Sequence, residues 1–236
     1  MNASISFPQN YQPLLDLRQT EPAIRQEDRS VDYLKFVVYK IYDVIRRTER
    51  YISHLYPEIV PTLPDEITIF HSENLERHFP NLSPKQREKG ICKGNKAVFV
   101  IGIGADLPGG KPHNGRARDY DDWSTPTRDG YKGMNGDILV YFPLLDCAYE
   151  PSSMGIRVDP PAMVHQPELR GANERRGLLF HRRLINGELP LSIGGRIGQS
   201  RLCMFFLRKA HIGEILSSLW PDEMVKACRA HNITLL

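Results

Sequence analysis

Apolar residues recur with a helical period early in the chain. They lie three or four positions apart, as on one face of an α-helix. Ser30, just before them, is a suitable N-cap, and Pro57 follows the last one. The pattern predicts one long amphipathic helix over residues 31–55. Its apolar positions are Val31, Leu34, Val37, Val38, Ile41, Val44, Ile45, Ile52 and Leu55.

Two short runs rich in β-branched residues, 67–70 and 97–103, predict buried strands. Between them, Ser83-Pro84-Lys85-Gln86 predicts a helix start, because Ser suits the N-cap, Pro the first turn and Gln the third position after the cap. Residues 104–135 are rich in Gly, Pro and Asp and predict a loop. Loops of that length inside a compact domain are usually functional or disordered.

Three extended runs follow in quick succession, at 137–142, 145–150 and 154–158. Their connections are too short for a crossover helix, so we expect an antiparallel meander. Strands grouped together, with helices before and after them, predict an α+β domain. The later helical patterns cover residues 174–186, 198–211 and 222–231.

Composition fits an ordinary globular protein, which we interpret as a single domain. The 236 residues are 41% hydrophobic and 25% charged, and the net charge of +3 is too small to indicate a nucleic-acid partner. No apolar run reaches the ~18 residues that span a bilayer, so we expect no membrane partner. The four cysteines form no C-x-x-C pair, which favours a reducing, cytoplasmic location.

Asp137 and Glu150 are the first candidates for chemistry. They flank a hairpin centred on Pro143-Leu144, and a symmetric register would place them directly opposite each other. Facing like charges destabilise a sheet, and Mg²⁺, which takes one or two carboxylates plus phosphates, would compensate. A register slipped by one residue would instead leave both on a solvated face. Ser152 shares the parity of Glu150 and would extend the same polar face.

Two further segments have chemical potential. The glycine cluster from Gly194 to Arg201 could let a backbone approach an anion at a helix N-terminus, but it matches neither a P-loop nor a Rossmann turn. It could equally be a turn that enters a core helix. The segment from Arg116 to Trp123 places three carboxylates beside two arginines, which suits a zwitterionic ligand or, alternatively, exposed ion pairs.

Taken in order, several stretches resemble the ammonia-dependent asparagine synthetases, or aspartate-ammonia ligases. The resemblance implies the catalytic core of class II aminoacyl-tRNA synthetases, an antiparallel sheet flanked by helices, built as a homodimer. It also implies adenylation of the aspartate side chain by Mg-ATP, with release of pyrophosphate, and displacement of AMP by ammonia. The matching stretches are Asp119–Trp123, Asn135–Ile138, Glu150–Val158, Ile193–Met204 and Leu219–Met224.

The resemblance also implies site roles for particular residues. Asp137 and Glu150 belong to the ATP and Mg²⁺ site, and Arg201 matches the motif-three arginine. Arg157 lines the nucleotide and aspartate pocket and, with Arg201, is implied to be catalytic. The residues implied to bind substrate are Asp121, Ser152, Ser153, Gly194 and Arg116; those implied to bind nucleotide are Asp137, Glu150, Arg157 and Arg201.

The chain also departs from the family pattern. Between Arg25 and Gln26 a domain-sized block of about one hundred residues is expected to be missing, which makes the class II core incomplete. The function implied is an aspartate-ammonia ligase, and the alternative is a non-catalytic or truncated member that binds nucleotide or pairs with a full-length homologue. Smaller departures are Arg196 in place of glycine, Pro151 in place of an aliphatic residue and Arg118 in place of proline.

Overall fold

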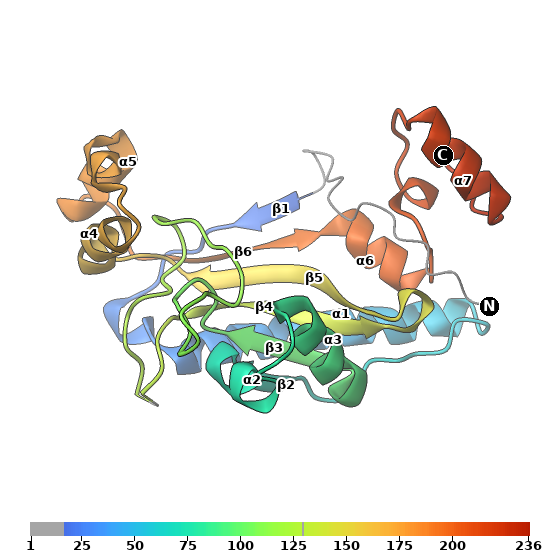
Figure 1. Cartoon of the computed structure of the whole chain (residues 1–236), viewed down its shortest axis with the longest axis horizontal. Coiled ribbons are helices and arrows are strands. Elements are labelled where there is room, and N and C mark those ends of the chain that lie inside the picture. Colours follow the sequence, from blue (N-terminus) through green and yellow to red (C-terminus); the bar gives the residue numbers. More distant parts are fainter. Residues whose placement is uncertain (1–16, 129) are drawn as a thin grey trace.

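A six-stranded sheet forms the centre of the molecule, with strand order β1-β6-β5-β4-β3-β2 (Figure 1). The computed structural model describes residues 17–128 and 130–236. Neighbouring strands are antiparallel except β2 and β3, which are parallel. The strands are β1 (Leu17–Thr20), β2 (Thr68–His71), β3 (Ala97–Ile101), β4 (Asn135–Phe142), β5 (Cys147–Ile156) and β6 (Ile193–Gly198).

Helices cover both faces of this sheet. On one face, α1 and α6 pack against residues of the strands such as Phe99, Ile138 and Ile156. On the other face, α2 and α3 pack against the alternate residues of the strands, among them Val98 and Leu139. The helices are α1 (Val31–Leu55), α2 (Ser72–His78), α3 (Pro84–Asn95), α4 (Pro160–Leu169), α5 (Leu179–Ile185), α6 (Gln199–Phe206) and α7 (Asp222–Ala230).

The α+β class and two helix starts agree with the sequence prediction. Helix α1 spans the predicted residues, and the Tyr33 N–H donates to Ser30 Oγ over 3.2 Å. Ser83 and Gln86 form the predicted capping box at the start of α3. No helix within the described ranges is both long and apolar enough to cross a membrane.

The predicted meander is wrong, since its last two runs form one strand. Strand β5 continues from Cys147 to Ile156, so β4 and β5 make a hairpin. The sheet is antiparallel as predicted, except that β2 and β3 are parallel. Helices α2 and α3 lie between them in sequence and provide the crossover that a parallel pair requires.

Two of the later helix predictions are also corrected. Residues 174–186 divide into a 3₁₀ turn and α5, because Leu178 is extended between them. The segment 198–211 begins with the last residue of β6 and ends early, since Arg208 has a left-handed φ of 53°. A left-handed residue just after the last turn is a common helix stop.

The predicted loop is present and packs against the sheet, where the Asp122 N–H donates to the Ile156 carbonyl of β5 over 2.9 Å. Its Trp123 is buried, and the Trp123 N–H donates to Gln166 Oε1 over 2.9 Å. Asp122, also buried, forms an ion pair with Arg29. Because these side chains are held in the interior, the loop between β3 and β4 has a defined position.

A buried carboxylate joins α1 to the end of α6. Glu49 is 1% exposed and accepts hydrogen bonds from the Thr62 N–H at 3.0 Å and the Leu63 N–H at 2.9 Å. Arg208 completes the cluster with an ion pair of 2.6 Å. One side chain thus fixes the connector after α1 and the turn that ends α6.

We predict that Glu49→Gln lowers the free energy of unfolding by about 2 kcal/mol, because hydrogen bonds to a charged group lose strength when the charge is removed. Urea denaturation measures the change. The control is Glu58→Gln at an exposed position, where the expected change is within about 0.5 kcal/mol. Equal stabilities of the two variants would contradict this role for Glu49.

Candidate functional site

A bulge in β5 determines the layout of the site. Ile138 of β4 pairs with Ser152, and Val140 pairs with Tyr149, so Glu150 and Pro151 together lie opposite the single residue between them on β4. Bulges suit proline, whose missing N–H leaves no gap in an already irregular ladder. The Glu150 carbonyl accepts a hydrogen bond of 3.0 Å from Arg201 Nη1.

The observed register of β4 and β5 overturns two predictions. Asp137 pairs with Ser153 and not with Glu150. Ser152 pairs with Ile138 on the α1 side of the sheet, and its hydroxyl donates to the Arg196 carbonyl over 3.1 Å. The symmetric register fails for two reasons: the turn is longer than two residues, since Phe142 pairs with Cys147, and the bulge then adds one more residue to β5. It is Ser153, not Ser152, that joins the face of Asp137.

Arg116 of the long loop joins this face to the pocket. Its guanidinium forms an ion pair with Asp137, which is 2% exposed, and donates to Ser153 Oγ over 3.2 Å. Arg116 Nε also lies 3.7 Å from Asp121 Oδ2. The arginine therefore bridges β4, β5 and the acidic part of its own loop.

Arg157, just beyond β5, is the centre of a second cluster. It forms an ion pair with Asp121, and its Nε and Nη2 lie 2.9 and 2.7 Å from the two carboxylate oxygens of Glu21. The guanidinium stacks 3.9 Å from the centre of the Tyr120 ring. The Tyr120 hydroxyl donates to Glu21 over 2.5 Å. Together these groups form a binding site for a carboxylate, and here the chain's own Glu21 fills it.

Sequence reasoning missed Glu21. It lies 136 positions from Arg157 in the chain, and no local motif connects the two. Strand β1, which ends just before Glu21, pairs with β6 and so brings Glu21 near the site. This pairing is visible in the fold but not in the sequence. Tyr120 lies within the stretch Asp119–Trp123, but the sequence predicts no role for it.

The glycine cluster lies in a strand and not in a turn. Gly194 and Gly195 belong to β6, between β5 and β1. A Cβ on Gly194 would lie 2.4 Å from Arg157 Nη2 and 2.3 Å from Glu21 Oε2. The absence of a side chain at Gly194 therefore gives this ion pair its room against the sheet.

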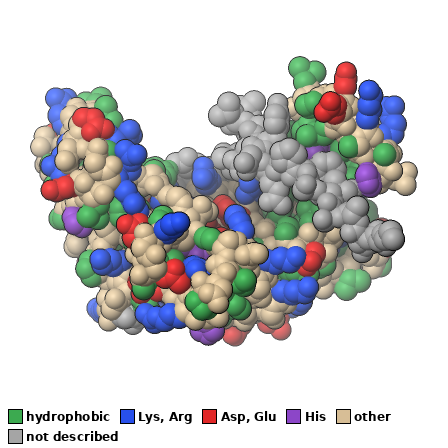
Figure 2. Space-filling model, in the orientation of Figure 1, with side chains coloured by type: hydrophobic (Ala, Val, Ile, Leu, Met, Phe, Trp, Pro, Cys, Tyr) green, Lys and Arg blue, Asp and Glu red, His purple; other side chains and the backbone are tan. Residues whose placement is uncertain are grey.

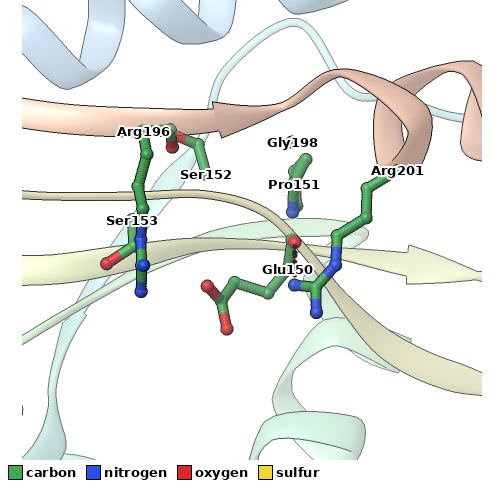
Figure 3. A pocket seen from close by; sticks show the side chains of 7 residues that line it. All are labelled: Glu150, Pro151, Ser152, Ser153, Arg196, Gly198 and Arg201. Carbon is green, nitrogen blue, oxygen red and sulfur yellow. Dashed lines mark hydrogen bonds between the residues drawn. The ribbon is translucent and has the colours of Figure 1, made fainter. Parts of the chain in front are cut away.

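Two adjoining cavities bring most of the predicted site residues together. The larger has a volume of about 220 Å³ and includes Arg116, Asp121 and Arg157 in its lining. The smaller, about 20 Å³, includes Glu150, Ser152 and Arg201 (Figure 3). Ser153 and Arg196 line both. Acidic and basic side chains are interspersed over the described part of the molecular face in Figure 2.

The three carboxylates of the loop have separate roles. Asp121 lines the larger cavity, whereas Asp122 pairs with Arg29. Asp119 contacts Arg175 and lies 2.7 Å from His181 Nε2. Only one of the three is therefore placed to contact a ligand in the cavity. The other two attach the loop to neighbouring segments.

Burial and a neighbouring negative charge raise the pKa of Glu150 to about 7. Burial is the larger cause, followed by Asp137. Burial also raises the pKa of Asp121, while Arg157 and Arg116 oppose that rise. Glu150 therefore exchanges a proton close to neutral pH.

The carboxylates suit a divalent cation that also has phosphate ligands. Within the described ranges, no group of three or more His, Cys, Asp or Glu side chains could hold a metal alone. Asp137 and Glu150 offer two oxygen donors, and Mg²⁺ commonly takes one or two carboxylates with phosphates and water. Their mutual repulsion is the unfavourable interaction that a cation would relieve.

We predict that Asp137→Asn lowers the pKa of Glu150 from about 7 toward its ordinary value, because a negative neighbour disappears. A carbon-detected NMR titration of the glutamate carboxyls measures it. The raised pKa of Glu150 also makes the stability of the fold depend on pH. The contribution of Glu150 is fully present below about pH 4.5, the ordinary pKa of a glutamate, and is lost as the pH rises through about 7. The control is Asp65→Asn, at a side chain 76% exposed; an equal shift in both variants would contradict the assignment.

Comparison with known proteins gives the family. A family described as aspartate-ammonia ligase matches residues 13–232. Curated proteins named aspartate–ammonia ligase from Parabacteroides distasonis and Bacteroides fragilis are each 50% identical over 216 residues, 92% of this chain and 63% of theirs. The aspartate–ammonia ligase from Ruminiclostridium cellulolyticum is 49% identical, and the match covers 62% of its length. The chain thus spans less than two thirds of the length of these relatives.

Solved structures give the fold. The asparaginyl-tRNA synthetase from Pyrococcus horikoshii, complexed with asparaginyl-adenylate, has a TM-score of 0.59 at 14% identity, over 84% of this chain and 45% of that one. The asparaginyl-tRNA synthetase from Entamoeba histolytica has a TM-score of 0.55 at 13% identity, and the match covers 83% of this chain and 44% of that one. These neighbours confirm a class II synthetase-like core. With the family match, they establish that the chain belongs to the aspartate-ammonia ligase family.

Proposed function

We propose that this chain forms asparagine from aspartate, ammonia and ATP through a β-aspartyl-adenylate. The observation that carries the proposal is the junction of two cavities at Ser153 and Arg196. One cavity has a carboxylate and an arginine suited to an amino acid, and the other adjoins the acidic pair suited to a metal-bound nucleotide. The names of relatives at 50% identity agree with this activity.

Recognition of aspartate follows from the larger cavity. Asp121 would accept hydrogen bonds from the substrate ammonium group, and Arg157 would donate to a substrate carboxylate. Arg157 lies beside Tyr120, whose ring limits the directions in which the guanidinium can turn. A substrate carboxylate that reaches Arg157 must displace Glu21.

The nucleotide would lie toward the smaller cavity. Asp137 and Glu150 would hold Mg²⁺, which offsets phosphate charge and makes pyrophosphate a better leaving group. Arg201, at the first turn of α6, lies against the Glu150 backbone and brings positive charge to the same region. In this proposal the phosphates lie beside the acidic pair and Arg201, where they would meet the side-chain carboxylate of aspartate.

The chemistry then proceeds in two displacements. A side-chain carboxylate oxygen of aspartate attacks the α-phosphorus of ATP, and the bond from that phosphorus to the pyrophosphate oxygen breaks. Ammonia next attacks the activated carbonyl carbon, loses a proton, and AMP leaves with the bridging oxygen. Arg157 and Arg201 act by orienting the reactants and stabilising developing negative charge, which supplies most of the catalysis in such reactions.

We further propose a homodimer in a reducing cytoplasm, with the shorter length due to a block absent after Arg25. An exposed stripe on α1 supports self-association, because apolar side chains at this density commonly mark an interface. All four cysteines, each in a described range, are free. The exposed apolar residues of α1 are Phe36, Tyr39, Val44, Tyr51 and Leu55.

Incubation with aspartate, ammonia and Mg-ATP is expected to yield asparagine and AMP in equal amounts. Amino-acid chromatography and nucleotide chromatography measure the two products. The control is Arg157→Gln, for which we expect a loss of at least about a hundredfold in rate, of the size seen when one charge-stabilising donor is removed. Folded protein that binds both substrates but releases neither product would contradict the proposal.

We predict that Glu21→Gln tightens aspartate binding several-fold, because Arg157 loses an anionic competitor for its guanidinium. Calorimetry with aspartate measures the dissociation constant without requiring turnover. Glu27→Gln is the matched control, since the Glu27 side chain is 71% exposed and, among the described residues, pairs with Arg25 alone. Unchanged or weaker binding by Glu21→Gln would mean that Arg157 does not receive the substrate carboxylate.

A further inference from the structure

Arg196 stands between the two cavities. It belongs to β6, pairs with Ser153 of β5, and is exposed. Figure 3 shows its side chain extended across the neighbouring strand beside Ser153, with Glu150 between Arg196 and Arg201. Because Arg196 lines both cavities, its guanidinium can reach a ligand that occupies either one.

The other arginines around the cavities already have partners. Arg116 pairs with Asp137, and Arg157 pairs with Asp121 and Glu21. Arg201 donates to the Glu150 carbonyl. Within residues 17–128 and 130–236, by contrast, the Arg196 guanidinium makes neither an ion pair nor a hydrogen bond. Its charge is therefore the one most accessible to an incoming anion.

The chemistry of the site favours a phosphate group as that anion. A guanidinium presents paired N–H groups that match two phosphate oxygens, and this bidentate contact is stronger than one to a neutral acceptor. A substrate carboxylate already has Arg157 in the larger cavity. The junction between an amino-acid cavity and a nucleotide cavity is also where the phosphorus under attack would lie.

We propose that Arg196 anchors the phosphate of the nucleotide closest to the aspartate, so that the side chain found where the family pattern has glycine is a ligand-binding residue. This inference rests on the proposed function and deepens it. The competing role is obstruction, in which the long side chain fills space that the nucleotide needs. The two roles predict opposite effects when the side chain is removed.

Calorimetry with AMP and with adenosine, which differ by one phosphate, separates these roles. For Arg196→Gln we expect at least a tenfold weaker affinity for AMP, unchanged affinity for adenosine, and a weaker dependence of AMP affinity on salt. Arg196→Lys should restore part of the loss. The matched control is Arg118→Gln, an exposed arginine of the nearby loop that lines neither cavity, and it should bind AMP normally.

Several results would overturn the inference. They are AMP binding by Arg196→Gln that equals or exceeds that of the unaltered chain, tighter binding by Arg196→Gly, and no AMP binding by the unaltered chain. Circular dichroism of each variant verifies folding, which should persist because Arg196 is exposed. Asparagine formation is measured separately. If Arg196→Gln loses AMP binding but the unaltered chain forms no asparagine, the proposed function is rejected, whereas the role of Arg196 in phosphate binding is supported.

Discussion

The bulge at Glu150 and Pro151 is the constraint on which the site depends. Side chains alternate along a strand, so one extra residue exchanges the two faces of everything that follows. With the bulge, Met154 and Ile156 enter the core against α1, while Ser153 meets Asp137. A strand without it would direct Ser153 into the apolar core and Met154 toward the cavities.

The second level of organisation is electrostatic. Arg116 and Arg157 are largely buried, and both contact Asp121 of the long loop; Arg116 also pairs with Asp137 of β4, and Arg157 with Glu21. Desolvation of such groups is costly unless the pairs are complete, and loss of one partner leaves an uncompensated charge. The network therefore holds the long loop against the sheet before any ligand arrives. A preorganised cavity of this kind reduces the ordering that binding requires.

Periodicity and capping chemistry predicted the parts of the fold that depend on local sequence. Helix α1 and the capping box at Ser83 are determined by residues within a few positions of each other. The bulge could not be predicted in the same way, because Pro151 resembles a strand end unless its partner strand is known. Strand β6 was also missed, since its glycines are explained by contacts with Met154 and Arg157 rather than by strand propensity.

The candidate site was predictable in composition more than in geometry. Most residues that the family resemblance selected line the two adjoining cavities, whereas Asp137 and Gly194 line neither. Ser152 lines the smaller cavity, but its hydroxyl donates to the Arg196 carbonyl. Only three-dimensional contacts reveal that Glu21 pairs with Arg157 and that the Arg196 guanidinium has no partner among the described residues. Both concern how charge is balanced around a ligand, which depends on distances that the sequence does not contain.

The central proposal is that one face of this sheet transfers the adenylyl group of ATP to aspartate and releases pyrophosphate. Exchange of labelled pyrophosphate into ATP tests it most directly, because the exchange isolates reversible adenylation from the later attack by ammonia. The predicted result is exchange in the presence of aspartate and Mg²⁺, and none when aspartate is omitted. The absence of exchange from folded protein that binds both aspartate and ATP would contradict the claim.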